Sequence, residues 1–171
     1  MKNFFPDLYS DLVPGTSAAG FHLGESLSSV SEKIGLVEWY GPEVMVRDIL
    51  AKNNSWVGVQ RKIGFGEERT LSYRFLNETV SLYFEGSGRL FRITVGERYR
   101  GRFNGVAVGD DLRSLGREFD ILFNDAEDDF ILQRGEDVLM GISFFTDHMA
   151  PLDVEPKQFI KFISIHDWSV R

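Results

Sequence analysis

A pattern of glycines and apolar residues occurs twice in this chain, and it constrains the fold more than any other feature. The first copy runs from Gly20 to Ile34 and the second from Gly105 to Phe119, 85 positions later. Each copy has two glycines, an acidic residue after the second glycine, and apolar residues at steps of four, three and four. These steps place the apolar side chains on one face of a short helix. Each copy is therefore predicted to begin with a helix, over about 25–34 in the first.

Other segments alternate apolar and polar residues with a period of two, which is typical of half-buried β-strands. In the first half this pattern predicts strands at 71–75, 80–84 and 91–95, and a further strand is expected at 56–63. In the second half it predicts strands at 128–132, 138–145 and 159–167. Residues 82–93 align with 131–142 at an offset of 49, so the two halves are predicted to share an antiparallel meander.

Two further segments are less regular. Residues 3–13 are predicted to form a short helix that Pro14 and Gly15 end. Residues 43–51 fit a helix or a strand equally well, and both interpretations stay open. Because the helices repeat at an offset of 85 and the hairpins at 49, the first half has about 36 extra residues, placed at about 36–69.

These patterns predict a single α+β domain over residues 1–171. We expect a pseudo-duplicated short helix plus antiparallel β-meander, with the helices packed on one face of the sheet. The repeat units are placed at about 18–100 and 101–168, with the insertion in the first unit.

The two copies of the motif give the chain a resemblance to a known fold. Two tandem units of a short helix and antiparallel hairpins look like the fold shared by the β-lactamase inhibitor protein and the small outer-membrane assembly lipoproteins. The resemblance rests on Gly20, Gly24, Glu25, Leu27, Val30, Gly105, Gly109, Asp110, Leu112 and Leu115. It implies a binding protein without catalytic residues, such as an inhibitor or an immunity protein that neutralises a toxin. The chain has no cysteine that could be lipidated, so a role in membrane assembly is not implied.

Negative charge is concentrated in the second half. The net charge is -7, and residues 110–137 hold ten acidic side chains against Arg113, Arg117 and Arg134. Such a surface steers a basic partner and raises its association rate. The plain alternative is a solvated connection between elements, and a calcium site fits poorly because the spacing of an EF-hand loop is absent.

We therefore expect a non-enzymatic protein-binding module, and above all an immunity or inhibitor protein that neutralises a bacterial toxin through the acidic surface. Trp39 and Tyr40 are added as aromatic anchors, with packing in the core as their alternative. The predicted partner-binding residues are Asp120, Asp125, Glu127, Asp128, Asp129, Glu136, Asp137, Trp39 and Tyr40.

Other classes of function have weaker sequence signals. Arg89, Arg92, Arg98, Arg100 and Arg102 form a basic stretch, but the chain is acidic overall, so we expect no nucleic-acid binding and consider pairing with the acidic half instead. Competing interpretations are a small hydrolase that uses carboxylates or a histidine at 148, and a structural subunit of an assembly.

We expect no cofactor and no metal, because the histidines are dispersed and cysteine is absent. No signal peptide or apolar run of membrane-spanning length is recognised, so we expect a cytoplasmic protein that does not bind a membrane.

Overall fold

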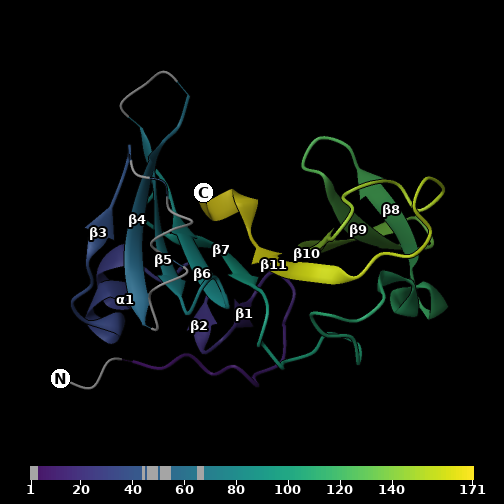
Figure 1. The fold of residues 1–171 in the computed structure, drawn as a ribbon, viewed down its shortest axis with the longest axis horizontal. Coiled ribbons are helices and arrows are strands. Elements are labelled where there is room, and N and C mark those ends of the chain that lie inside the picture. The colour runs from purple at the N-terminus through teal and green to yellow at the C-terminus, as the bar shows by residue number, and fades with distance from the viewer. Residues whose placement is uncertain (1–3, 44, 46–49, 51–54, 65–67) are drawn as a thin grey trace.

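The computed structural model describes residues 4–43, 45, 50, 55–64 and 68–171. Among these residues nine strands form one sheet, in the order β3-β4-β5-β6-β7-β11-β10-β9-β8 (Figure 1). The separate strands β1 (Ser17–Ala18) and β2 (Phe21–His22) pair with each other. The strands of the sheet are β3 (Trp39–Tyr40), β4 (Trp56–Lys62), β5 (Arg69–Phe75), β6 (Val80–Phe84), β7 (Leu90–Val95), β8 (Asp120–Asn124), β9 (Asp129–Arg134), β10 (Asp137–Thr146) and β11 (Ile160–His166).

The pairing of β7 with β11 lies at the centre of the sheet. On one side of it β4, β5, β6 and β7 pair in an antiparallel meander, and on the other β8, β9, β10 and β11 do the same. The two central strands are also antiparallel, with Val95 opposite Ile163 and Arg92 opposite His166. At the outer edge β3 pairs with β4 in parallel, which makes the sheet mixed.

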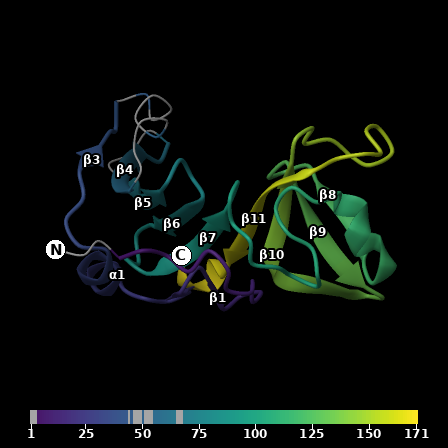
Figure 2. The same cartoon turned by 60° about the horizontal axis from the view of Figure 1, so that its bottom comes forward.

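The described helical segments are short. The α-helix α1 (Leu27–Ile34) begins at Ser26, whose side chain accepts a hydrogen bond from the backbone N–H of Ser29, and it ends at Gly35. The 3-10 helix η1 (Leu112–Arg117) is capped by Asp111, and a second 3-10 helix, η2 (Trp168–Val170), follows β11. Figure 2 shows α1 at the end of the molecule near β3 and η1 beside β8 at the opposite end.

In the first copy of the motif, Gly24 has a φ of 85°, a conformation that favours glycine. Its N–H donates to the carbonyl of Leu90, the first residue of β7, and the N–H of Leu90 donates back to the carbonyl of Glu25. The Glu25 carboxylate accepts from the backbone N–H of His22 at 2.7 Å. The motif therefore closes a turn and fastens it to the start of β7.

The second copy makes the same contacts with β11. Gly109 has a φ of 94°, and its N–H donates to the carbonyl of Ile160, whose N–H donates to the carbonyl of Asp110. The Asp110 carboxylate accepts from the N–H of Ala107 at 2.9 Å. By these contacts β7 in the first half corresponds to β11 in the second half. The predicted offset of 49 gives a different correspondence, in which β6 and β7 are equivalent to β9 and β10.

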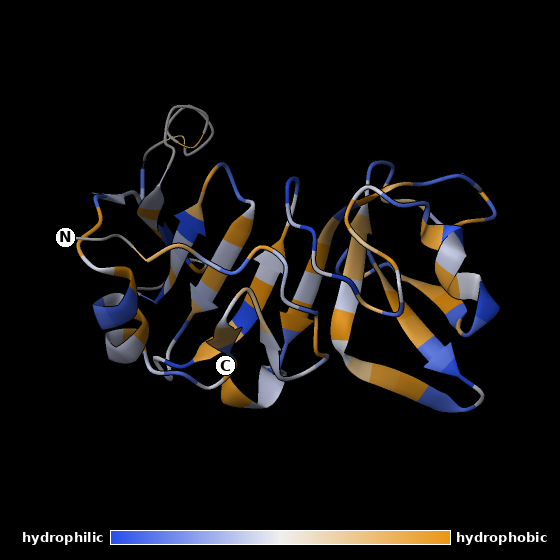
Figure 3. Cartoon of the chain, turned by 90° about the horizontal axis from the view of Figure 1, so that it is seen from below, coloured by the Kyte–Doolittle hydropathy of each residue, from blue (hydrophilic) through white to orange (hydrophobic). Residues whose placement is uncertain are grey.

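The main core lies on one face of the sheet. Orange and paler bands alternate along the central strands in Figure 3, as expected for strands with two different faces. The apolar side chains of one face pack against α1 through Val30 and Ile34, and against η1 through Leu112 and Leu115. Buried strand residues in this core include Tyr73, Phe75, Leu82, Phe84, Ile93, Val95, Phe130, Phe144, Ile163 and Ile165.

The predicted fold class is wrong. Strands account for 42% of the described residues and helix for 12%, so this part of the protein is a mixed nine-stranded sheet and not a helix-plus-meander α+β fold. One reason is that the second copy of the motif forms a six-residue 3-10 helix that contains Gly116, a residue that disfavours an α-helix. A second reason is β8, a strand that the sequence analysis missed.

The predicted helix at 3–13 is also absent over its described residues. Asp7 instead accepts hydrogen bonds from the backbone N–H groups of Tyr9 and Ser10, which forms a local turn. The helix at 25–34 and the six predicted strands from 71–75 onward are confirmed, as is the strand at 56–63. The ambiguous segment 43–51 lies largely outside the described residues.

A buried tyrosine holds the N-terminal segment against the centre of the molecule. Tyr99 is fully buried, and its hydroxyl donates to the carbonyl of Ser10 at 2.7 Å and accepts from the N–H of Ala19 at 3.0 Å. The backbone N–H of Arg100 also donates to the carbonyl of Leu8. This tyrosine thus joins two points near the N-terminus to a residue 80 and 89 positions later in the sequence.

We expect Tyr99→Phe to lower the free energy of unfolding by about 1–3 kcal/mol, because it leaves buried backbone groups without a partner. Urea unfolding measures this change. Tyr9→Phe is the matched control, since Tyr9 is 77% exposed and should tolerate the same change. Equal stability of the two variants would show that the Tyr99 hydroxyl does not hold the segment.

Candidate functional site

The predicted acidic residues lie at two ends of β9. The acidic turn, between β8 and β9, consists of Asp125, Glu127 and Asp128. The far acidic group, at the start of β8 and at the turn between β9 and β10, consists of Asp120, Glu136 and Asp137. The six residues of β9 separate them by roughly 17 Å. The carboxylates that are close in the sequence are therefore divided between two surfaces.

Asn124 and Asp129 shape the acidic turn from inside. The Asn124 side-chain amide donates to the Asp129 carboxylate at 2.9 Å, and its oxygen accepts from the N–H of Ala126. Asp129 is buried, unlike the other predicted acidic residues, so it supports the turn and offers little surface to a partner. Asp128 takes a left-handed conformation with a φ of 54°.

Among the described residues, cations lie beyond ion-pair distance of the exposed carboxylates in these two groups, although the charge of Glu127 still acts on Arg171. Within the described part of the chain, no member of the acidic turn or the far acidic group forms an ion pair within 4.0 Å. Two arginines of the basic stretch have other contacts: Arg89 donates to the carbonyl of Gly24, and Arg102 lies 3.5 Å from Asp110, which is in the acidic half but in neither of these groups. Internal pairing between the basic stretch and these two acidic groups is therefore not observed.

An apolar patch lies beside the acidic turn, on the sheet face opposite α1. It consists of Val138, Met140 and Trp168, which are 42%, 71% and 42% exposed. Together with Glu127 and His166 they line a depression of about 200 Å³. Exposed apolar side chains that gather in one place are characteristic of a binding surface.

Trp168 is held in place by its neighbours. Its ring stacks on His166 with centroids 4.8 Å apart and meets the ring of Phe91 at 5.6 Å. His166 is buried, and this burial lowers its pKa below the ordinary value of 6.5, while Asp129 acts in the opposite direction and Arg92 in the same direction. The apolar patch thus rests on an aromatic pair whose histidine favours the neutral form.

Trp39 and Tyr40 lie on β3, the outer strand at the edge of the sheet opposite to β8 and the acidic turn. Trp39 covers Gly58 so closely that a Cβ there would lie 2.2 Å from its ring, and it meets the ring of Tyr73 at 5.1 Å. Tyr40 packs against Val57 and other residues of a small second core. These contacts give both residues a packing role, and they do not join the acidic surface.

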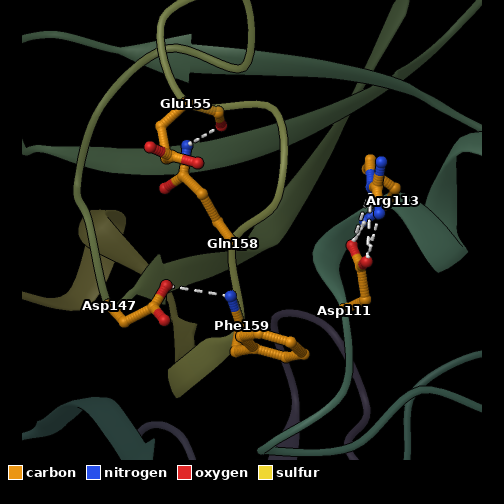
Figure 4. A network of polar contacts seen from close by, with 6 residues as sticks. All are labelled: Asp111, Arg113, Asp147, Glu155, Gln158 and Phe159. Carbon is orange, nitrogen blue, oxygen red and sulfur yellow. Dashed lines mark hydrogen bonds and ion pairs between the residues drawn. The ribbon is translucent and has the colours of Figure 1, made fainter.

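The loop between β10 and β11 carries the histidine considered for catalysis. His148 is half exposed, 3.9 Å from the Asp147 carboxylate. Figure 4 shows Asp147 accepting a hydrogen bond from the backbone N–H of Phe159, and Gln158 donating to the carbonyl of Glu155, while Asp111 pairs with Arg113 nearby. Asp147 is thus engaged in holding the loop closed.

Three residues of the apolar patch were not predicted as a site. Val138 and Met140 are two positions apart and therefore share one face of β10, which a period-two pattern could have indicated. Gly141, with a φ of 83° next to an irregular register, interrupts the alternation after them. Trp168 lies just beyond the last predicted strand, where the alternation gives no signal.

The chain matched no protein-family model, no curated protein and no solved structure. Its resemblance to the inhibitor and lipoprotein fold therefore stays a prediction. The described residues contain no group of three His, Cys, Asp or Glu side chains placed to hold a metal ion. They also contain no helix that is both long and apolar enough to span a bilayer.

The lowered pKa of His166 predicts a stability that depends on pH. The unfolded chain binds a proton at this histidine near its ordinary pKa, whereas the folded chain binds it only at lower pH. The free energy of unfolding therefore falls as the pH drops from about 7.5 to about 5.5, and His166→Gln should reduce this fall.

Urea unfolding at the two pH values measures the effect, and His148→Gln serves as the control because that side chain is half exposed on a loop. If His166→Gln loses as much stability on acidification as the wild type does, the buried histidine is not the source of the dependence.

Proposed function

We propose that this chain is a non-enzymatic binding protein whose partner is a protein with a basic surface. The observation that carries the proposal is the position of Glu127, which lines the same depression as the apolar patch. Asp125 and Asp128 are exposed in the same turn, and none of the three carboxylates forms an ion pair with another described residue. Binding surfaces commonly combine an apolar centre with a polar rim, and Trp is enriched among the residues that contribute most to binding.

The two parts of this surface have different physical roles. The acidic turn steers a basic partner and excludes acidic ones, since like charges brought together cost free energy. Met140 and Trp168 supply apolar area that leaves water on binding, which slows dissociation. The partner is therefore selected by charge and retained by apolar contact.

The partner class that we propose is a bacterial toxin domain, which would make this chain an immunity or inhibitor protein. The resemblance of the duplicated motif supports this class. Charge complementarity also supports it, because toxins that act on nucleic acids have basic clefts for phosphate groups. The far acidic group and the β3 edge are not needed for this mode of binding.

Charge reversal distinguishes the acidic turn from a general effect of net charge. The triple variant Asp125→Lys, Glu127→Lys, Asp128→Lys should bind a toxin domain encoded beside this gene with an association rate lower by about tenfold or more at low salt. Surface plasmon resonance at several salt concentrations measures the rate. The wild-type rate should fall with salt, because screening weakens the steering.

The matched control reverses the far acidic group with Asp120→Lys, Glu136→Lys and Asp137→Lys, which changes the net charge equally. This control should stay within about threefold of the wild-type rate. If both triple variants lose association rate equally, the acidic turn is not the surface that steers the partner. A wild-type protein that binds none of the adjacent toxin domains at low salt would contradict the immunity function.

A further inference from the structure

A second depression lies where the two meanders of the sheet meet. It has a volume of about 240 Å³ and opens on the sheet face opposite α1. We call it the seam pocket, and it is lined from β6, β7, β10 and β11 by Ser81, Tyr83, Arg92, Thr94, Phe145 and Phe162, with Glu78 at the turn before β6. It therefore depends on the β7–β11 pairing.

The register of the strands builds a polar floor between aromatic walls. Ser81 lies opposite Thr94, which in turn lies opposite Ser164, so three hydroxyl side chains follow one another across the sheet. Tyr83 and Arg92 form the next row on one side. On the other side the ring of Phe162 covers Gly96, where an added Cβ would lie 2.7 Å from it.

Arg92 is the unusual member of this pocket. Its guanidinium carbon lies 4.2 Å from the centre of the Tyr83 ring, a cation–π contact that holds the group over the ring. Its Nε is buried without a hydrogen-bond partner, and among the described residues its side chain forms no ion pair. A buried donor without a partner is costly, so an arginine in this state is well suited to an acceptor from outside the chain.

The nearest carboxylate does not pair with Arg92. Glu78 pairs with Arg74, so its carboxylate is already engaged. Arg74 is itself buried, and this burial lowers the pKa of its guanidinium. The positive charges of Arg61 and Arg92 lower it further by a smaller amount. Ser164, beside the floor, has a buried hydroxyl without a partner among the described residues. The seam pocket thus combines an unpaired cation, hydroxyl groups and aromatic rings.

We propose that the seam pocket binds a small aromatic carboxylate. The planar guanidinium of Arg92 matches a carboxylate through two parallel hydrogen bonds, an arrangement that Lys cannot reproduce. The rings of Tyr83, Phe145 and Phe162 supply apolar and aromatic contact for a ring of the ligand. The volume suffices, since a cavity of about 150 Å³ in another protein holds benzene.

This site is independent of the proposed protein partner. The acidic turn attracts cations and lies between β8 and β9, whereas the seam pocket attracts an anion and lies between the two meanders. Failure of one proposal therefore leaves the other intact.

Titration of the full chain with benzoate, followed by amide chemical shifts, tests the proposal. We expect saturable shifts at Ser81, Thr94 and Phe162, and affinity for neutral benzamide lower by at least about tenfold, because a charge-assisted bond to the guanidinium is lost. Arg92→Gln should weaken benzoate binding by about tenfold or more for the same reason.

Arg98→Gln is the matched control, because Arg98 is exposed outside the pocket and should keep affinity within about twofold. Benzoate that shifts none of these amides, or benzamide that binds equally well, would overturn the proposal. An equal loss in both arginine variants would do the same. If Arg92→Gln does not fold by circular dichroism, Arg92→Lys replaces it, and its affinity should also fall because the paired hydrogen bonds are lost.

Discussion

The antiparallel pairing of β7 with β11 is the interaction on which the rest of the structure depends. It joins two four-stranded meanders into one sheet and gives each meander a partner on its inner edge. The duplicated motif reinforces it, since Gly24 is fastened to the first residue of β7 and Gly109 to the first residue of β11. Both central strands are therefore fixed at the point where they begin.

This arrangement leaves the two faces of the sheet unequal. The described helices α1 and η1 pack on one face, where the apolar side chains form the main core. The other face carries serines, arginines and a histidine in neighbouring rows, with Ser81, Ser143 and Ser164 nearly inaccessible to solvent. Polar groups buried in this way need partners, so Arg92 Nε and the Ser164 hydroxyl, which have none among the described residues, are exceptions in their two neighbouring rows.

The sequence predicted the local elements better than their arrangement. Period-two alternation located β5, β6 and β7, and the apolar steps of four, three and four located α1. The β8 strand was missed because its apolar residues form a short continuous run at 121–123 between acidic residues, which gives no alternation to recognise.

The site shows a similar limit. Acidic residues from Asp120 to Asp137 were grouped because they are close in the sequence. The turns before and after β9 lie at opposite ends of that strand, so the acidic residues of the two turns are separated by its length. Arg92 was counted within a basic stretch, although a strand alternates its side chains between faces. Its position over Tyr83 depends on register, which the composition of one segment does not determine.

The β8 edge of the sheet has one more consequence. Exposed outer strands invite a second molecule to add its own strand, which leads to aggregation. Here the outer strand has Asp120 at one end and Asp125 just beyond the other, so two copies aligned in opposite directions would bring carboxylates face to face. Electrostatic repulsion thus disfavours pairing of β8 with the β8 of a second copy. A strand rich in lysine or arginine could still pair with this edge, because its charges are opposite.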